Sequence, residues 1–234
     1  MPYRSMSLED FAEHVGMDVR QVRRLADRGS LPAQKVGGQW RFNRAEVTEW
    51  LQQEMPSFDE RRLITLEQAM GGEASGMTVT ELIGLEGIDV ALVANTRASV
   101  LRELVNLADR TGRLYDAKGL LQAVQERESM CSTALPHGVA IPHPRQPMPY
   151  VSSEPIICVA RLTRGLGFGS PYRDLTQLFF LICCHDDRHH LRVLARLVRL
   201  LDEHTIHRIM AVEAPEDLLA CLIEKESQVV SQGL

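Results

Sequence analysis

The sequence predicts an α+β protein of two domains, a small helical unit with a hairpin followed by an α/β sandwich built on a mixed sheet. Three observations lead to this prediction. The 234 residues are 44% apolar and 24% charged, which is enough to bury two small cores. Basic side chains gather near the N-terminus, and from residue 78 onward apolar runs of strand length alternate with helical periodicities. We expect domains at residues 1–55 and 77–234, joined by a linker at 56–76.

Composition excludes several classes of protein. The net charge is −5, and the five cysteines form no Cys-x-x-Cys pair. Because no signal-peptide pattern is present either, we expect a reduced, cytoplasmic chain. The longest apolar run, residues 178–184, is too short to span a bilayer, so we expect no membrane insertion. The charge is uneven, however: residues 16–45 hold seven basic and two acidic side chains, which makes them a candidate anion-binding face.

The N-terminal residues predict two helices joined by a short turn. Ser7 can cap the first helix together with Asp10, and Gly16 ends it. Asp18 caps the second helix, whose outward positions are Arg20, Gln21, Arg23, Arg24 and Arg28. A short turn between two helices, the second rich in Arg and Gln, is typical of a helix-turn-helix.

A hairpin follows at residues 33–42, with the Gly-Gly pair at 37–38 as its two-residue turn. Lys35 and Arg41 take solvated positions on this hairpin. Asn43 then caps a third helix, whose apolar side chains can cover the small sheet. Together these elements predict a helix-turn-helix with a wing.

Residues 6–52 carry a specific series of motifs, in order Ser7-Leu8-Glu9-Asp10, Val15-Gly16, Arg24-Leu25, Gly29-Ser30-Leu31-Pro32-Ala33, Val36-Gly37-Gly38-Gln39-Trp40-Arg41-Phe42 and Trp50-Leu51. This segment resembles the excisionase-type winged helix-turn-helix, related to the MerR group. The resemblance implies that the second helix enters a DNA major groove, where Arg and Gln read base edges. Lys35 and Arg41 would contact phosphates. Such modules usually act as dimers on paired half-sites, so we expect a homodimer. The alternative is a helix-turn-helix that serves only as a docking module.

Strands and helices alternate in the remainder of the chain. Four apolar runs have strand length: residues 88–92, 139–141, 156–162 and 178–184. Residues 99–109 predict an amphipathic helix, and Asp116 caps another. Three further helices start near His190, Thr205 and Ala214. This alternation predicts a sandwich with a buried mixed sheet.

His143 is the candidate nucleophile of this second domain. It lies between Pro142 and Pro144, just past an apolar strand. Both prolines restrict the backbone, so we expect the imidazole to be held rigidly toward solvent. A neutral imidazole, with an ordinary pKa of about 6.5, can attack phosphorus. The plain alternative is a histidine in a proline-rich turn without chemistry.

The residues around His143 form a second series of motifs: Arg127, Ser132-Thr133, Gly138-Val139-Ala140-Ile141-Pro142-His143, Gly167-Phe168-Gly169-Ser170-Pro171 and His190-Leu191. Residues 77–227 thereby resemble the enzyme IIA domain of the fructose/mannitol class of the bacterial phosphotransferase system, above all its nitrogen-related regulatory branch. The resemblance implies that His143 is phosphorylated by an HPr-like carrier, with His190 and Arg127 as active-site companions. An arginine fork suits phosphate oxygens, and a histidine that opens a helix lies where the dipole favours an anion.

Two features depart from the family pattern. Ala134-Leu135-Pro136-His137 replaces a run that is usually rich in glycine, and His137 adds a third imidazole. Cys183 and Cys184 precede a histidine, which raises the possibility of zinc. Adjacent cysteines alternate faces on a strand and cannot readily chelate one ion, so we expect no metal and no cofactor.

These patterns favour a regulator that accepts a phosphoryl group on His143 and binds DNA, with the added charge acting through a hinge near residues 71–76. One alternative is a sugar-transport enzyme IIA that passes phosphate to an enzyme IIB. For the regulator, the candidate targets are regulatory proteins. Another is a DNA-binding protein whose second domain only senses or oligomerises. The N-terminal helix-turn-helix favours the regulator, because a sugar relay needs no DNA-binding unit.

Overall fold

A computed structural model describes residues 5–71, 78–171 and 174–231. The chain divides into two compact units. The first unit comprises residues up to Gly76 together with Asp187–Arg199, and the second comprises Met77–Asp186 and Leu200–Leu234. The predicted α+β class is confirmed, but the return of a late segment to the first unit is a feature that the sequence did not indicate.

The first unit contains the two helices expected from the capping residues. Helix α1 (Leu8–Val15) has a capping box between Ser7 and Asp10, and the Gly16 N–H bonds to carbonyls of the last turn at φ +67°. Asp18 caps α2 (Val19–Asp27) by accepting hydrogen bonds from the backbone of Arg20 and Gln21. The local rules of helix capping therefore account for the helix-turn-helix.

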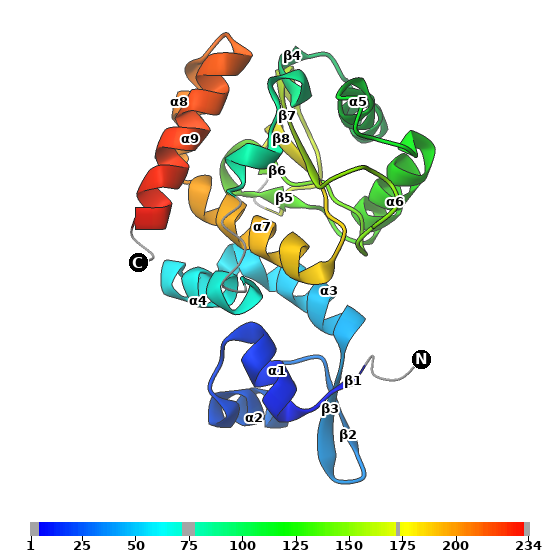
Figure 1. The fold of residues 1–234 in the computed structure, drawn as a ribbon, viewed down its shortest axis with the longest axis vertical. Coiled ribbons are helices and arrows are strands. Elements are labelled where there is room, and N and C mark those ends of the chain that lie inside the picture. Colours follow the sequence, from blue (N-terminus) through cyan, green and yellow to red (C-terminus); the bar gives the residue numbers. More distant parts are fainter. Residues whose placement is uncertain (1–4, 72–77, 172–173, 232–234) are drawn as a thin grey trace. The chain divides into compact units, whose positions relative to one another are not determined.

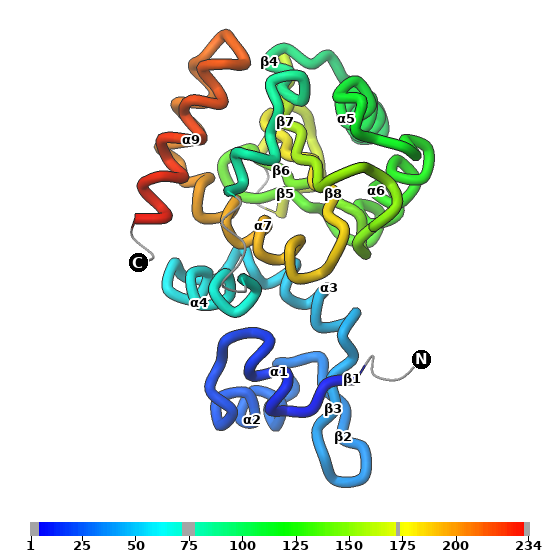
Figure 2. The backbone as a smooth tube through the Cα atoms, viewed as in Figure 1, coloured from blue at the N-terminus to red at the C-terminus, as the bar shows by residue number. Residues whose placement is uncertain are grey.

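A three-stranded antiparallel sheet completes the small core. Its order is β1 (Ser5–Met6), β3 (Gln39–Asn43), β2 (Ala33–Val36). The β2–β3 hairpin, whose course is clear in Figure 2, turns at Gly37 and Gly38, which have φ values of 58° and 80°. Only glycine takes two such angles without strain, so the predicted wing is confirmed. Phe11 stacks on Phe42 with ring centroids 4.2 Å apart and closes the core between helix and sheet.

Three more helices belong to the first unit. Asn43 caps α3 (Arg44–Glu54), and a 3₁₀ turn, η1 (Met55–Ser57), follows at Pro56. Helix α4 (Glu60–Met70), which Asp59 caps, lies within residues 56–76, the stretch expected to be the linker. Helix α7 (Asp187–Leu200) joins these elements from far along the chain. The expected hinge near residues 71–76 lies outside the described residues except for Gly71.

The second unit is built on a mixed sheet. Within the described residues this sheet has five strands in the order β4 (Ile88–Leu92), β7 (Ile156–Leu166), β8 (Thr176–Cys183), β6 (Val139–Ala140), β5 (Ala134–Leu135). The β4–β7 and β6–β8 pairs are parallel, and the β7–β8 and β5–β6 pairs are antiparallel. The four predicted strands are confirmed, whereas the two-residue β5 was not expected.

Helices cover the sheet on both sides, as Figure 1 shows. Helices α5 (Arg97–Arg110) and α6 (Ala117–Met130) pack on one face, where alternate β7 residues, Ile156, Cys158 and Ala160, enter a buried apolar cluster. Helix α9 (Pro215–Ser231) packs beside β4 and against α8 (Glu203–Ala211). Among the described residues, no helix is both long and apolar enough to cross a membrane.

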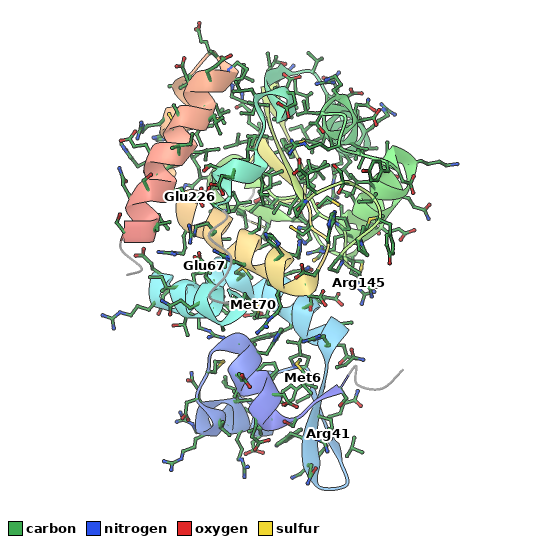
Figure 3. All side chains as sticks on the ribbon, viewed as in Figure 1. Met6, Arg41, Glu67, Met70, Arg145 and Glu226 are labelled. Atoms are coloured by element: carbon green, nitrogen blue, oxygen red, sulfur yellow. The ribbon has the colours of Figure 1, made fainter. Side chains whose placement is uncertain are left out.

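Two polar side chains fasten the outer helices. Arg161 of β7 donates hydrogen bonds to the backbone carbonyls of Val90, Ile209, Met210 and Val212, so it closes the C-terminal end of α8. Glu226 of α9, labelled in Figure 3, accepts hydrogen bonds from the backbone of Val79 and Thr80 at 2.8 and 2.9 Å. These contacts fix the helices around the sheet that holds the candidate site.

Candidate functional site

His143 follows the short central strand β6. Strand pairing continues past the end of β6, because the Ile141 N–H bonds to the Thr133 carbonyl at 3.1 Å and the Ile182 N–H to the Pro142 carbonyl at 3.0 Å. The segment that leads to the histidine is therefore anchored on both sides. His143 is only 3% exposed, so the expectation that its imidazole faces solvent is wrong.

The imidazole of His143 is held by its own backbone. Its Nδ1 lies 2.6 Å from the carbonyl oxygen of Ile141. A carbonyl can only accept, so Nδ1 carries the proton and donates it. In the neutral ring, Nε2 then carries the lone pair. The backbone thus selects which ring nitrogen can act as a nucleophile.

Arg127 lies in the last turn of α6 and is buried. Its guanidinium donates to the Cys131 carbonyl at 3.0 Å and contacts the Cys131 sulfur at 3.2 Å. The sequence places it at a helix end from which it can swing. The structure instead ties it to the backbone just before Thr133, whose carbonyl pairs with Ile141. Arg127 and His143 thus belong to the same hydrogen-bonded part of the second unit.

A buried carboxylate supports this part of the unit, and sequence reasoning missed it. Glu128 accepts hydrogen bonds from the Thr133 backbone N–H at 3.2 Å and from its hydroxyl at 2.7 Å. It also forms an ion pair with Arg97 at 3.0 Å. The Arg97 guanidinium stands over the Phe168 ring at 5.3 Å, and Ser132 donates to the Phe168 carbonyl. Glu128 and Arg97 thereby link motif residues 132–133 to Phe168. No local sequence pattern indicated the buried charge of Glu128, which directly follows Arg127.

His190 belongs to the first unit, in the first turn of α7, as expected for a histidine that opens a helix. It is 3% exposed, and its Nε2 lies 3.0 Å from the side-chain amide nitrogen of Gln52 on α3. The two residues are 138 positions apart, so no sequence pattern could indicate this contact.

The residues that depart from the family pattern, His137, Cys183 and Cys184, differ in their exposure and in their neighbours. His137 is exposed and has a left-handed backbone, with φ of 62°, which is uncommon for a non-glycine residue. Burial raises the pKa of the Cys183 thiol to about 12 and also raises the pKa of Cys184. Their neighbour His185 lies 3.1 Å from the Ser152 hydroxyl. Among the described residues, no three His, Cys, Asp or Glu side chains are grouped as metal ligands.

The outward face of α2 carries the predicted DNA-binding side chains. Only Val22 and Ala26 of this helix are buried. The polar residues that share the opposite, exposed face are Arg20, Gln21, Arg23, Arg24 and Arg28. The structure therefore presents these cations and the amide on one surface, as a reading helix requires.

The wing adds cations next to that helix. Lys35 is exposed and lies 5.5 Å from the centre of the Trp40 ring, and Arg41, labelled in Figure 3, donates to Gln39 at 2.8 Å. A depression between α2 and the wing is lined by Arg23, Lys35 and Arg41, and also by two carboxylates, Glu9 and Asp27. The α2 surface and the wing belong to one compact unit.

The fold and these two sets of residues define the class: a winged helix-turn-helix unit in one chain with an α/β sandwich that bears a buried histidine past a central strand. Residues 81–225 match the family model of the phosphoenolpyruvate-dependent sugar phosphotransferase system, EIIA 2, and the chain belongs to this family. Residues 5–55 match a model of a helix-turn-helix domain. Both sequence resemblances agree with these matches.

Three similar proteins match between 56% and 65% of this chain. A nitrogen regulatory protein of Bradyrhizobium diazoefficiens is 34% identical over 134 residues, which are 56% of this chain and 84% of the relative. The fructose-specific EIIABC component of Bacillus subtilis is 27% identical over 154 residues, 65% of this chain and 24% of the relative. This chain therefore spans about a quarter of the length of that protein. The solved structure of nitrogen regulatory protein IIA-Ntr from Neisseria meningitidis, 24% identical, covers 62% of this chain and 98% of its own with a TM-score of 0.55, and it shows the fold.

Proposed function

We propose that this protein is a regulator that accepts a phosphoryl group on Nε2 of His143 from an HPr-like carrier and couples this modification to DNA binding. The observation that carries the proposal is the hydrogen bond from His143 Nδ1 to the Ile141 carbonyl. It leaves Nε2 as the nitrogen with the lone pair, which is what attack on phosphorus requires.

The transfer balances without a separate acid or base. The Nε2 lone pair forms the new N–P bond while the N–P bond to the carrier's histidine breaks, and that electron pair leaves with the carrier's ring. The proton on His143 Nδ1 stays in place. Positive charge that develops on the ring is met by the Ile141 carbonyl dipole, which is already 2.6 Å from Nδ1. The backbone is thus preorganised for the phosphorylated state.

Two further residues enter the proposal from the family pattern. Arg127 supplies a guanidinium, the group best suited to hold phosphoryl oxygens. Its bonds to Cys131 leave the buried Nε without a hydrogen-bond partner in the described part of the chain, so the guanidinium has a donor to spare. His190 is the second companion, and the dipole of α7 favours an anion near its first turn. Phosphoryl transfer depends on such positioning and charge neutralisation more than on covalent help.

The DNA-binding part of the proposal rests on the exposed face of α2 and on the wing. Arg20, Gln21, Arg23, Arg24 and Arg28 would meet base edges and phosphates in a major groove, with Lys35 and Arg41 on the flanking backbone. A homodimer on paired half-sites is the arrangement that such modules favour. Phosphorylation adds close to two negative charges, which can change docking between protein parts or with DNA.

The acceptor of the phosphoryl group distinguishes the regulator from a transport component. A solved complex pairs the mannitol enzyme IIA of Escherichia coli with its phosphorylated enzyme IIB. A chain of that complex is 22% identical to this chain and matches its fold with a TM-score of 0.53. An enzyme IIB is therefore the acceptor to test first for the transport alternative. The helix-turn-helix domain at residues 5–55 favours regulation.

Transfer of a radioactive phosphoryl group from a phosphorylated HPr-like carrier tests the assignment of His143. The wild type should gain an acid-labile, alkali-stable label, and His143→Ala should not. His204→Ala is the matched control, because His204 is an exposed histidine on α8. Labelling of His143→Ala at the wild-type rate would contradict the proposal.

A further inference from the structure

Helix α7, which carries His190, contacts α3 and α4, the two helices that follow the wing of the helix-turn-helix unit. Helix α3 starts at Arg44, directly after the last strand of the wing, and α4 follows it. Gln52 on α3 is 8% exposed and its amide nitrogen lies 3.0 Å from Nε2 of His190. A side chain of the first 55 residues thus contacts the ring of a proposed active-site companion within a single compact unit.

Ionic contacts along α7 hold it in register with α4. Glu67 of α4, labelled in Figure 3, pairs with Arg196 and, at 2.8 Å, with Arg199. Glu67 and Arg199 are both buried. At the other end of the contact, Arg188 donates to the Ala69 carbonyl at 3.2 Å. Buried charges with partners on both helices leave little freedom for α7 to slide, so the Gln52–His190 contact has a fixed geometry.

The chemistry of the contact determines where His190 carries its proton. An amide nitrogen is a donor and has no lone pair to offer, so the Nε2 of His190 must accept. The proton of the neutral ring then lies on Nδ1. The ring nitrogen that can donate to a phosphoryl oxygen is therefore chosen by a residue of α3. In the ligand sites of metalloproteins, outer hydrogen-bond partners of histidine play the same part.

We propose that Gln52 is a positioning residue for phosphoryl transfer, one that holds the His190 imidazole in its Nδ1–H form and ties it to the DNA-binding unit. This inference rests on the proposed function of His143. Its consequence is regulatory: any displacement of α3 that accompanies DNA binding moves the side chain that orients His190. By linkage, a change at His190 acts back on α3 with the same free energy.

Nitrogen NMR of the histidine rings tests the inference without a phosphoryl donor. In the full chain labelled with ¹⁵N, His190 should show a protonated Nδ1 and an unprotonated Nε2, with its signals assigned by their loss in His190→Gln. Gln52→Ala should remove this preference, and Gln53→Ala, a change at the exposed neighbour on the same helix, should retain it. An unchanged His190 tautomer in Gln52→Ala would overturn the proposal.

Gln52→Glu provides a result that loss of folding cannot imitate. A carboxylate accepts hydrogen bonds, so it should draw the proton of His190 to Nε2 and reverse the tautomer. In the transfer assay, Gln52→Ala should label His143 about 2- to 12-fold more slowly than the wild type, the range expected for one net hydrogen bond. Equal rates in Gln52→Ala and wild type would overturn the positioning role alone. Failure of the wild type to take any label would overturn the proposed function and, with it, this role in transfer.

Discussion

Glu128→Gln is the substitution that most sharply tests how Thr133, which pairs with Ile141 just before His143, is held in place. Gln has the shape of Glu, but it exchanges one carboxylate oxygen for an NH₂ group. In the wild type both oxygens face donors, namely the backbone N–H and hydroxyl of Thr133 and the guanidinium of Arg97. In the variant at least one N–H group must face another donor. The buried acceptor thus loses its charge and part of its hydrogen bonding at the same time.

The magnitude follows from the separate contacts. Hydrogen bonds to a charged group contribute about 1.5–3 kcal/mol, compared with about 1 kcal/mol for neutral ones. The ion pair adds at most about 1 kcal/mol, because the Arg97 side chain is 43% exposed while Glu128 is 4% exposed. We therefore expect Glu128→Gln to lower the free energy of unfolding by about 2–3 kcal/mol, and to lower Tm by about 4–10 °C.

Thermal and urea unfolding followed by circular dichroism measures this loss. Glu126→Gln is the matched control, since it makes the same chemical change on the exposed face of α6, where the Glu126 carboxylate accepts a hydrogen bond from the side chain of Gln122. The control should change the free energy of unfolding by less than about 0.5 kcal/mol. If Glu128→Gln and Glu126→Gln unfold at the same temperature, Glu128 does not hold residues 132–133, and the support inferred for the His143 segment is wrong.

Three further predictions concern other parts of the molecule. Burial, with the positive charges of Arg44 and Arg188, lowers the pKa of His14 from 6.5 to about 4. The unfolded state therefore binds the extra proton first. As pH falls from about 6.5 to 4, the wild type should lose about 2–3 kcal/mol of stability relative to His14→Gln, as measured by urea titrations. If the free energies of unfolding of the two proteins change in parallel with pH, this prediction is contradicted. Arg161→Met should lower the free energy of unfolding by about 2–3 kcal/mol, because four backbone carbonyls lose their donor; an unchanged urea midpoint would argue against that role. Arg24→Ala should reduce the salt dependence of binding to a duplex selected by the wild type by about one unit of log–log slope, measured by fluorescence anisotropy, whereas Arg102→Ala on α5 should not.

Local rules explain why much of the fold is predictable. Ser7 with Asp10, Asp18 and Asn43 cap the first three helices as expected, because capping depends on residues within one turn. The Gly37-Gly38 turn likewise sets the wing. The two long apolar runs, at residues 156–162 and 178–184, become strands β7 and β8 because burial on both faces requires continuous apolar sequence. By contrast, β5 and β6 have two residues each, and the pairing of β5 with β6 is decided by neighbours rather than by its own sequence.

The candidate site is less predictable from sequence. His143 and His190 are found through motif resemblance, yet the burial of His143 and the bond from its Nδ1 to Ile141 depend on how the strand end packs. The contact of Gln52 with His190 joins residues far apart in the chain, and Glu128 is one acidic residue in an ordinary helix pattern. Such nonlocal polar contacts leave no periodic signal, because only the folded chain brings the partners together.

The most direct test of the central claim is the affinity of the full chain for a duplex that it has itself selected from a random pool, measured with and without the phosphorylated carrier. If phosphorylation of His143 is coupled to DNA binding, the carrier should change the Kd of the wild type by about 5-fold or more, and should leave the Kd of His143→Ala unchanged. Equal affinities of the labelled and unlabelled wild type, or the same change in His143→Ala, would contradict the claim.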